Sequence, residues 1–206
     1  MNHKINNFKE LRALVGEPSE LAIRKVITFI DEHCEKFLAH SPFLILSTAD
    51  SSGYSDASPR GDAPGFVIVL DQKRIVIPER PGNKRMDSLK NILSNPSVGL
   101  LFLIPGMPET LRVNGKASLT LDPIVLEKMA AGGKKPILGI EVEVEECFIQ
   151  CGKALKRSGL WDPDSWAEKH SLPLGAEILA AHSRLPGTSV ADIEARLKDG
   201  YKNRLY

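Results

Sequence analysis

Three short polar segments of this chain carry the cationic and hydroxyl side chains that bind anions. Residues 56–62 read DASPRGD, residues 78–88 read PERPGNKRMDS, and residues 110–117 read TLRVNGKA. A phosphate monoester binds to guanidinium groups, to hydroxyls and to the free backbone N–H groups of a helix N-terminus. The glycines of these segments would let the backbone approach such a ligand closely. The residue types therefore predict a phosphate-binding site, and the alternative is a set of solvent-exposed turns rich in arginine.

The standard signatures of other catalytic classes are missing from the sequence. It contains no GxSxG, HExxH or GxGxxG motif and no Walker lysine loop. Its five histidines are scattered, and Cys147 and Cys151 lie four residues apart without a nearby histidine, which makes a poor metal site. Cys34 falls on the apolar face of a predicted helix and is expected to be packed. A hydrolase or a zinc enzyme is therefore disfavoured, and no metal is expected.

The composition is that of a globular protein without a polyanion-binding or membrane-spanning character. The chain has 206 residues, of which 42% are hydrophobic and 26% charged, with a formal net charge of +1. A charge near zero argues against general nucleic-acid binding, and no apolar run approaches the roughly 20 residues that span a bilayer. The first residues lack the apolar segment of a signal peptide. We therefore expect a cytoplasmic protein with reduced thiols and with neither nucleic-acid nor membrane partners.

The hydrophobic pattern predicts helices at both ends of the chain and a series of short strands between them. Ser19 would cap a helix whose apolar residues recur at steps of three and four and which Pro42 would stop. Further helices are expected at 84–94, 124–130 and 190–197. The predicted strands are 43–49, 54–60, 66–71, 74–79, 98–104, 110–121 and 137–149.

Six or seven short strands joined mostly by tight turns favour an antiparallel arrangement. Such a set avoids open edges by forming a closed or partly closed barrel. We expect a mainly β fold with flanking helices. Residues 1–18 would form an N-terminal arm, residues 19–165 the barrel domain, and residues 166–206 a helical extension of that domain.

The polar segments also carry a family resemblance. Residues 77–106, IPERPGNKRMDSLKNILSNPSVGLLFLIPG, together with residues 110–117 resemble the pyridoxamine 5′-phosphate oxidase-related, FMN-binding split-barrel family. Residues 43–62 resemble its opening hairpin, and residues 151–161, CGKALKRSGLW, resemble a C-terminal element of one subfamily. The resemblance implies a split β-barrel of six or seven mostly antiparallel strands. It also implies FMN bound at a homodimer interface and a flavin-dependent oxidoreductase acting on a small molecule, with NAD(P)H as one candidate electron donor.

The same resemblance assigns residues to the cofactor. The flavin ring and ribityl chain would meet the second strand, and backbone at the end of the fourth strand would lie beside the isoalloxazine. A basic turn would hold the phosphate. Other residues would approach from the next strand of the dimer and from the partner chain. The residues assigned to the ring and ribityl chain are Ser58, Pro59, Arg60 and Gly61, and those with backbone beside the isoalloxazine are Ile77 and Pro78. The residues assigned to the phosphate are Arg80, Asn83, Lys84, Arg85 and Ser88. Those that would approach from the next strand of the dimer are Thr110 and Arg112, and those from the partner chain are Lys153, Arg157 and Trp161.

One departure from the family limits what the resemblance implies about substrate. An Arg-Leu-His-type motif after a tryptophan, which the authentic oxidase uses for pyridoxal phosphate, is not evident. Vitamin B6 oxidation is therefore not expected, and no catalytic residue is assigned. Two alternatives stay open: a reductase that uses the deazaflavin F420 on the same scaffold, and a non-catalytic flavin- or haem-binding protein. Haem would need an axial ligand, and the scattered histidines offer no obvious one.

Overall fold

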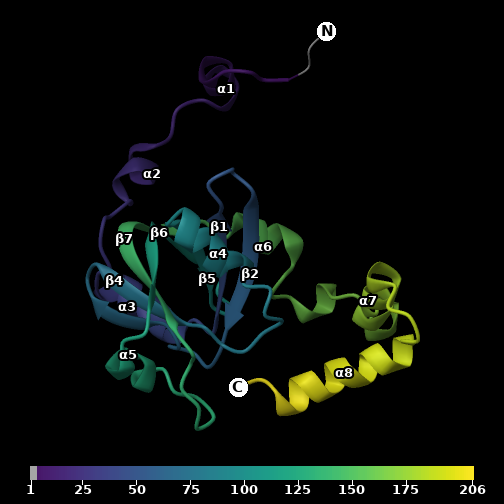
Figure 1. The fold of residues 1–206 in the computed structure, drawn as a ribbon. Coiled ribbons are helices and arrows are strands. Elements are labelled where there is room, and N and C mark those ends of the chain that lie inside the picture. Colours follow the sequence, from purple (N-terminus) through teal and green to yellow (C-terminus); the bar gives the residue numbers. More distant parts are fainter. Residues whose placement is uncertain (1–3) are drawn as a thin grey trace.

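The centre of the molecule is a seven-stranded antiparallel sheet, seen in a computed structural model that describes residues 4–206 (Figure 1). The strand order is β2-β1-β5-β6-β7-β4-β3, and every neighbouring pair is antiparallel. The expectation of a mainly β fold with flanking helices is therefore confirmed, with seven strands. Their bounds are β1 Phe43–Ala49, β2 Ser55–Gly61, β3 Ile68–Asp71, β4 Arg74–Pro78, β5 Ser97–Leu103, β6 Thr110–Thr120 and β7 Gly139–Gln150.

Alternation of apolar and polar residues along the strands builds the core. In β7, Ile140, Val142 and Val144 are buried, whereas Glu143 and Glu145, on either side of Val144, are exposed. The same two-residue period runs along β1 and β5, because successive side chains of a strand point to opposite faces. The fully buried side chains of the core include Leu44, Leu46, Ile75, Ile77, Leu100, Phe102, Leu111 and Val113.

Side chains join the two ends of the curled sheet. β2 is one edge strand, and β4 lies next to the other edge. Arg60 of β2 nevertheless forms an ion pair with Glu79, directly after β4, and Asp62 after β2 pairs with Arg80 at 2.7 Å. A bulge in β7 at Glu145, opposite Asn114 and Gly115 of β6, adds to the bend of the sheet. The sheet is thus curled into a split barrel whose seam is bridged by charged side chains.

The prediction of a single long helix from Ser19 to the residues before Pro42 is wrong. The chain instead forms α2 (Glu20–Arg24) and α3 (Glu32–His40), separated by an extended segment. In that segment the N–H of Ile27 donates to the carbonyl of Cys147 at 3.0 Å, and the N–H of Cys147 donates back at 2.7 Å. This pairing with β7 takes the backbone out of a helix, and Asp31 then caps α3. The predicted cap at Ser19 is confirmed for α2.

The helix expected at 84–94 begins later, as α4 (Asp87–Ser94). Lys84 and Met86 have φ angles of 62° and 61°, in the left-handed region, so the chain turns there before it becomes helical. α4 is anchored to the sheet through the buried Asn91. Its amide donates to Thr48 Oγ1 at 3.0 Å and to Asp56 Oδ2 at 2.8 Å. The late start of α4 leaves residues 79–86 as a loop beside the seam.

Helices at the two ends of the chain stand outside the sheet (Figure 1). α1 (Phe8–Val15) lies in the expected N-terminal arm and buries none of its residues. Residues 1–3 of that arm lie outside the described residues, and the expected boundaries after residues 18 and 165 stay predictions. The other helices are α5 Pro123–Lys128, α6 Lys153–Ser158, short 3₁₀ turns at Pro163–Ser165 and Lys169–Ser171, α7 Gly175–Ser183 and α8 Val190–Asn203.

Candidate functional site

A cavity of about 730 Å³ lies at the seam of the barrel. Its walls come from the end of β2, the end of β4, the loop 79–86 and the first turn of α4. Nine of the residues that the resemblance assigned to a cofactor line this one cavity, although they come from separate segments of the chain. These nine are Pro59, Arg60, Gly61, Pro78, Arg80, Asn83, Lys84, Arg85 and Ser88.

Arg60 places a buried, partly unsatisfied guanidinium in the cavity wall. Its side chain is 14% exposed and that of its ion-pair partner Glu79 is 22% exposed. The Nε atom of Arg60 is buried and has no hydrogen-bond acceptor within residues 4–206. A buried donor without an acceptor is costly, since it has lost water and gained nothing in exchange. The wall is therefore suited to a ligand that brings an acceptor to this position.

Arg80 is held in the wall by several partners at once. Its Nε lies 2.7 Å from Asp62 Oδ2, and its Nη2 donates to the carbonyl of Met129 at 2.8 Å. The guanidinium also lies 5.4 Å from the ring centre of Tyr206, whose hydroxyl donates to Asp62 Oδ1 at 2.7 Å. Burial acts to raise the pKa of Asp62. The hydrogen bonds from Tyr206 and the Ala63 N–H, together with the Arg80 guanidinium, outweigh burial and lower that pKa.

The loop before α4 forms a cationic end of the cavity. Lys84 is exposed and makes no hydrogen bond or ion pair within the described chain. Arg85 pairs with Asp87 at 2.8 Å, and this hydrogen bond raises the pKa of Arg85. Met86, at the N-cap of α4, provides no side-chain cap for the first turn of the helix. The N–H groups of that turn, next to the buried Ser88, are therefore available to an anion.

The remaining predicted residues do not line this cavity in a single chain. Ser58 is half-buried on β2, and the Ile77 side chain is in the core, although the expectation for Ile77 concerned its backbone. The other five predicted residues lie on β6, on α6 and in the turn after α6. Thr110 lies 3.5 Å from Gln150, Arg112 stacks 5.5 Å from the Phe148 ring, Lys153 and Arg157 are exposed, and Trp161 Nε1 donates to the Met107 carbonyl at 2.9 Å. The resemblance assigned these five residues to the site through a second chain of a dimer, and that assignment stays a prediction.

Sequence reasoning missed several contributors to the wall. Glu79 lies in the basic segment 78–88 and could have been noted there as a counter-charge for an arginine. The apolar lining residues Phe66, Ile137 and Leu138 resemble ordinary turn and strand-end residues in the sequence. Tyr206 does not line the cavity but supports Arg80, and it gave no signal, since only the folded chain brings it back to Arg80.

None of the helices formed by residues 4–206 combines the length and the apolar character needed to cross a membrane.

Comparison with solved structures finds similar chains at low sequence identity. HupZ of Group A Streptococcus is 15% identical with a TM-score of 0.49, over 59% of this chain and 94% of that one. An FMN-binding protein from Syntrophomonas wolfei is 11% identical with a TM-score of 0.44, over 55% and 80%. HutZ, the heme storage protein from Vibrio cholerae, is 15% identical with a TM-score of 0.44, over 59% and 94%. No curated protein matches the chain.

A family model matches the chain at the level of its sequence. The sequence model of the family described as pyridoxamine 5′-phosphate oxidase matches residues 30–151, which is more than half of the chain. The matched range runs from the segment before α3 to the end of β7, so it contains the whole sheet and every residue that lines the cavity. Together with the split-barrel architecture, this match shows that the chain belongs to the pyridoxamine 5′-phosphate oxidase family.

Proposed function

We propose that this protein binds FMN in the seam cavity and acts as a flavin-dependent oxidoreductase. The observation that carries the proposal is the convergence of nine residues, assigned to the cofactor from sequence, on one cavity of about 730 Å³. Ligand sites of this kind combine apolar walls with a few placed polar groups. Here the lining contains four basic and two acidic side chains, alongside Phe66, Pro78, Ile137 and Leu138. This composition suits a flat ring with an anionic tail.

The residues divide into two groups by the part of the cofactor that they suit. Lys84, Arg85, Ser88 and the first turn of α4 would hold the phosphate, because they offer cations, a hydroxyl and free N–H groups at one end of the cavity. Arg60 would donate from its unsatisfied Nε to an acceptor on the ring or the ribityl chain. FMN, when bound, supplies the hydride or electron transfer, and the protein supplies position and electrostatics.

We further propose that a homodimer completes the site. The seam cavity is open to solvent along the loop 79–86, whose residues Pro81 to Met86 are all exposed. Thr110 and Arg112 on β6, with Lys153, Arg157 and Trp161 at the C-terminal end of the barrel, would cover it from a second subunit. An isologous dimer would give two equal sites, each built from both chains. Sedimentation velocity with and without FMN tests this arrangement, and a monomer that binds FMN tightly would contradict it.

Titration with FMN and with riboflavin tests the proposed phosphate end. The measurement is quenching of flavin fluorescence by the wild-type protein, by Lys84→Gln and by Lys90→Gln, an exposed lysine on α4 outside the cavity lining. A charge-assisted hydrogen bond at an exposed position is worth about 1 kcal/mol, which is about a fivefold change in Kd. We expect Lys84→Gln to weaken FMN binding by that factor and to leave riboflavin binding unchanged. Equal losses for both lysine variants, or for both flavins, would contradict the assignment.

A second set of ligands separates the alternatives on the same scaffold. The FMN-loaded protein should oxidise NADH or NADPH, or reduce a small electrophile after chemical reduction of the flavin. Binding of F420 in preference to FMN would instead favour the deazaflavin reductase. Binding of haem in place of flavin would favour a non-catalytic haem protein, although the described cavity lining contains no histidine to serve as axial ligand.

A further inference from the structure

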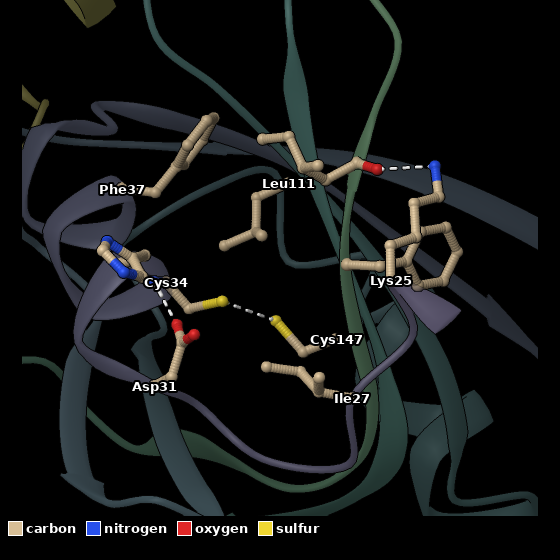
Figure 2. A pocket seen from close by; sticks show the side chains of 10 residues that line it. Lys25, Ile27, Asp31, Cys34, Phe37, Leu111 and Cys147 are labelled. Carbon is tan, nitrogen blue, oxygen red and sulfur yellow. Dashed lines mark hydrogen bonds between the residues drawn. The ribbon is translucent and has the colours of Figure 1, made fainter. Parts of the chain in front are cut away.

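A second cavity, away from the seam, contains two buried thiols that face each other (Figure 2). Cys34 belongs to α3 and is 8% exposed, and Cys147 belongs to β7 and is fully buried. Their sulfur atoms are 3.4 Å apart, with the Cys147 thiol donating to Cys34. Neither residue takes part in the proposed flavin site.

Backbone hydrogen bonds fix both cysteines in place. The reciprocal pair between Ile27 and Cys147, at 3.0 and 2.7 Å, fastens the segment before α3 to β7. Asp31 then caps α3 and accepts from the N–H of Cys34 at 2.8 Å. The short distance between the sulfurs therefore follows from an ordered helix cap and an ordered strand, rather than from two mobile side chains.

A small molecule can reach Cys34, which is 8% exposed, whereas the fully buried Cys147 needs only to meet the Cys34 sulfur. They line a cavity of about 210 Å³ together with Ile27, Asp31 and Phe37. A water molecule occupies about 30 Å³ of liquid, so the cavity admits an oxidant of peroxide size. Figure 2 shows the two sulfurs pointing toward each other beneath Leu111.

The two thiols differ in character. The hydrogen bond donated by Cys147 lowers the pKa of Cys34, against burial and the nearby Asp31 carboxylate, which both act to raise it. Donating that same hydrogen bond, together with burial, raises the pKa of Cys147. Because the thiolate is the nucleophile, Cys34 is the sulfur that reacts first.

We propose that Cys34 and Cys147 form a peroxide-oxidised dithiol site that closes to a reversible disulfide. The Cys34 thiolate attacks one oxygen of hydrogen peroxide, breaking the O–O bond and giving a sulfenic acid, and the hydroxide that leaves takes a proton to become water. Cys147 then attacks the Cys34 sulfur, the S–O bond breaks, and the Cys147 proton leaves with the hydroxide as a second water. Two thiols are thereby oxidised by two electrons while peroxide is reduced to two waters.

The disulfide would cross-link parts of the chain that are 113 residues apart in sequence. It would tie the N-terminal end of α3 to β7 by a covalent bond, where hydrogen bonds and packing now do so. Because a cross-link between distant residues restricts the unfolded chain, the oxidised protein should unfold at a higher temperature than the reduced protein.

The test uses the full chain carrying Cys151→Ser, which removes the exposed third thiol. After treatment with hydrogen peroxide and removal of the excess, intact mass and thiol titration in denaturant are measured. We expect the mass to fall by two hydrogens, both remaining thiols to disappear, one linked peptide pair to form, and dithiothreitol to restore the thiols. Two titratable thiols after treatment, or a gain of oxygen atoms without a linked peptide, would overturn the proposal.

Single-thiol variants in the same background assign the order of attack. With Cys147→Ser, Cys34 should accumulate as a sulfenic acid that dimedone traps. With Cys34→Ser, Cys147 should stay unlabelled. Labelling of Cys147 at the rate seen for Cys34 would overturn the assigned order. Circular dichroism establishes that each variant is folded, and the mass measurement on Cys151→Ser needs neither of them.

Discussion

Replacing Glu79 by glutamine should destabilise the protein by removing the only anion that faces the Arg60 guanidinium across the barrel seam in the described chain. The two side chains form an ion pair and are 14% and 22% exposed. The Nε atom of Arg60 already lacks an acceptor within residues 4–206. Glu79→Gln would therefore leave a largely buried cation without its counter-charge.

The expected loss follows from the burial of the pair. Breaking a fully buried ion pair by removing one partner costs roughly 3–5 kcal/mol, and exposed pairs are worth about 0–1 kcal/mol. Because this pair is mostly but not fully buried, we expect a loss of about 2 kcal/mol in the free energy of unfolding. For a chain of this length, that corresponds to a fall of about 4–8 °C in Tm.

A double-mutant cycle measures the interaction directly. Thermal and urea unfolding would be followed for the wild type, Glu79→Gln, Arg60→Gln and the double variant, without added ligand. The free energy of unfolding lost in the double variant should be smaller, by at least about 1 kcal/mol, than the sum of the losses in the two single variants. The reason is that the double variant leaves no unpaired buried charge. As a control, Glu194→Gln breaks the exposed pair with Lys198, whose side chains are 55% and 74% exposed, and should leave Tm almost unchanged. Strict additivity in the cycle would show that Arg60 and Glu79 do not stabilise each other, contrary to this prediction.

Three further predictions concern the seam and the sheet. Tyr206→Phe removes the hydrogen bond to Asp62 and should lower Tm by a few degrees in thermal unfolding, since such a bond is worth about 1 kcal/mol after screening. The pKa of Asp62 is lowered on folding from its ordinary value of 3.8, so its contribution to stability is present above that pH and is lost as pH falls below it. Acid titration of wild type and Asp62→Asn should show this, and identical acid unfolding curves would contradict it. Gly115→Ala places a Cβ 2.0 Å from the Glu143 carbonyl oxygen and should cost more than about 2 kcal/mol in urea unfolding, whereas Gly99→Ala, with a 3.4 Å contact, should cost about 1 kcal/mol or less.

The strands were predictable because their signal is local. In β7 the alternation of Ile140, Val142 and Val144 with glutamates marks a half-buried strand without knowledge of its neighbours. The break between α2 and α3 was not predictable in this way. It depends on the backbone pairing of Ile27 with Cys147, a contact between distant residues that leaves no periodic trace in the sequence.

The candidate site was likewise predictable only where its signal is local in the sequence. The cationic segments identified the loop before α4, because arginine, lysine, glycine and serine are dense there. Their local structure differed from the prediction, since Lys84 and Met86 adopt left-handed backbone angles that are uncommon for residues other than glycine. The pairing of Arg80 with Asp62 and Tyr206 depends on the folded chain alone.

The flavin site is tested by the absorbance spectrum of the purified protein and of the supernatant released from it by heat. We expect flavin absorbance, release of FMN at about one molecule per chain, and the same stoichiometry when stripped protein is reloaded with FMN. A colourless protein that also fails to take up added FMN would contradict a flavin site in the seam cavity.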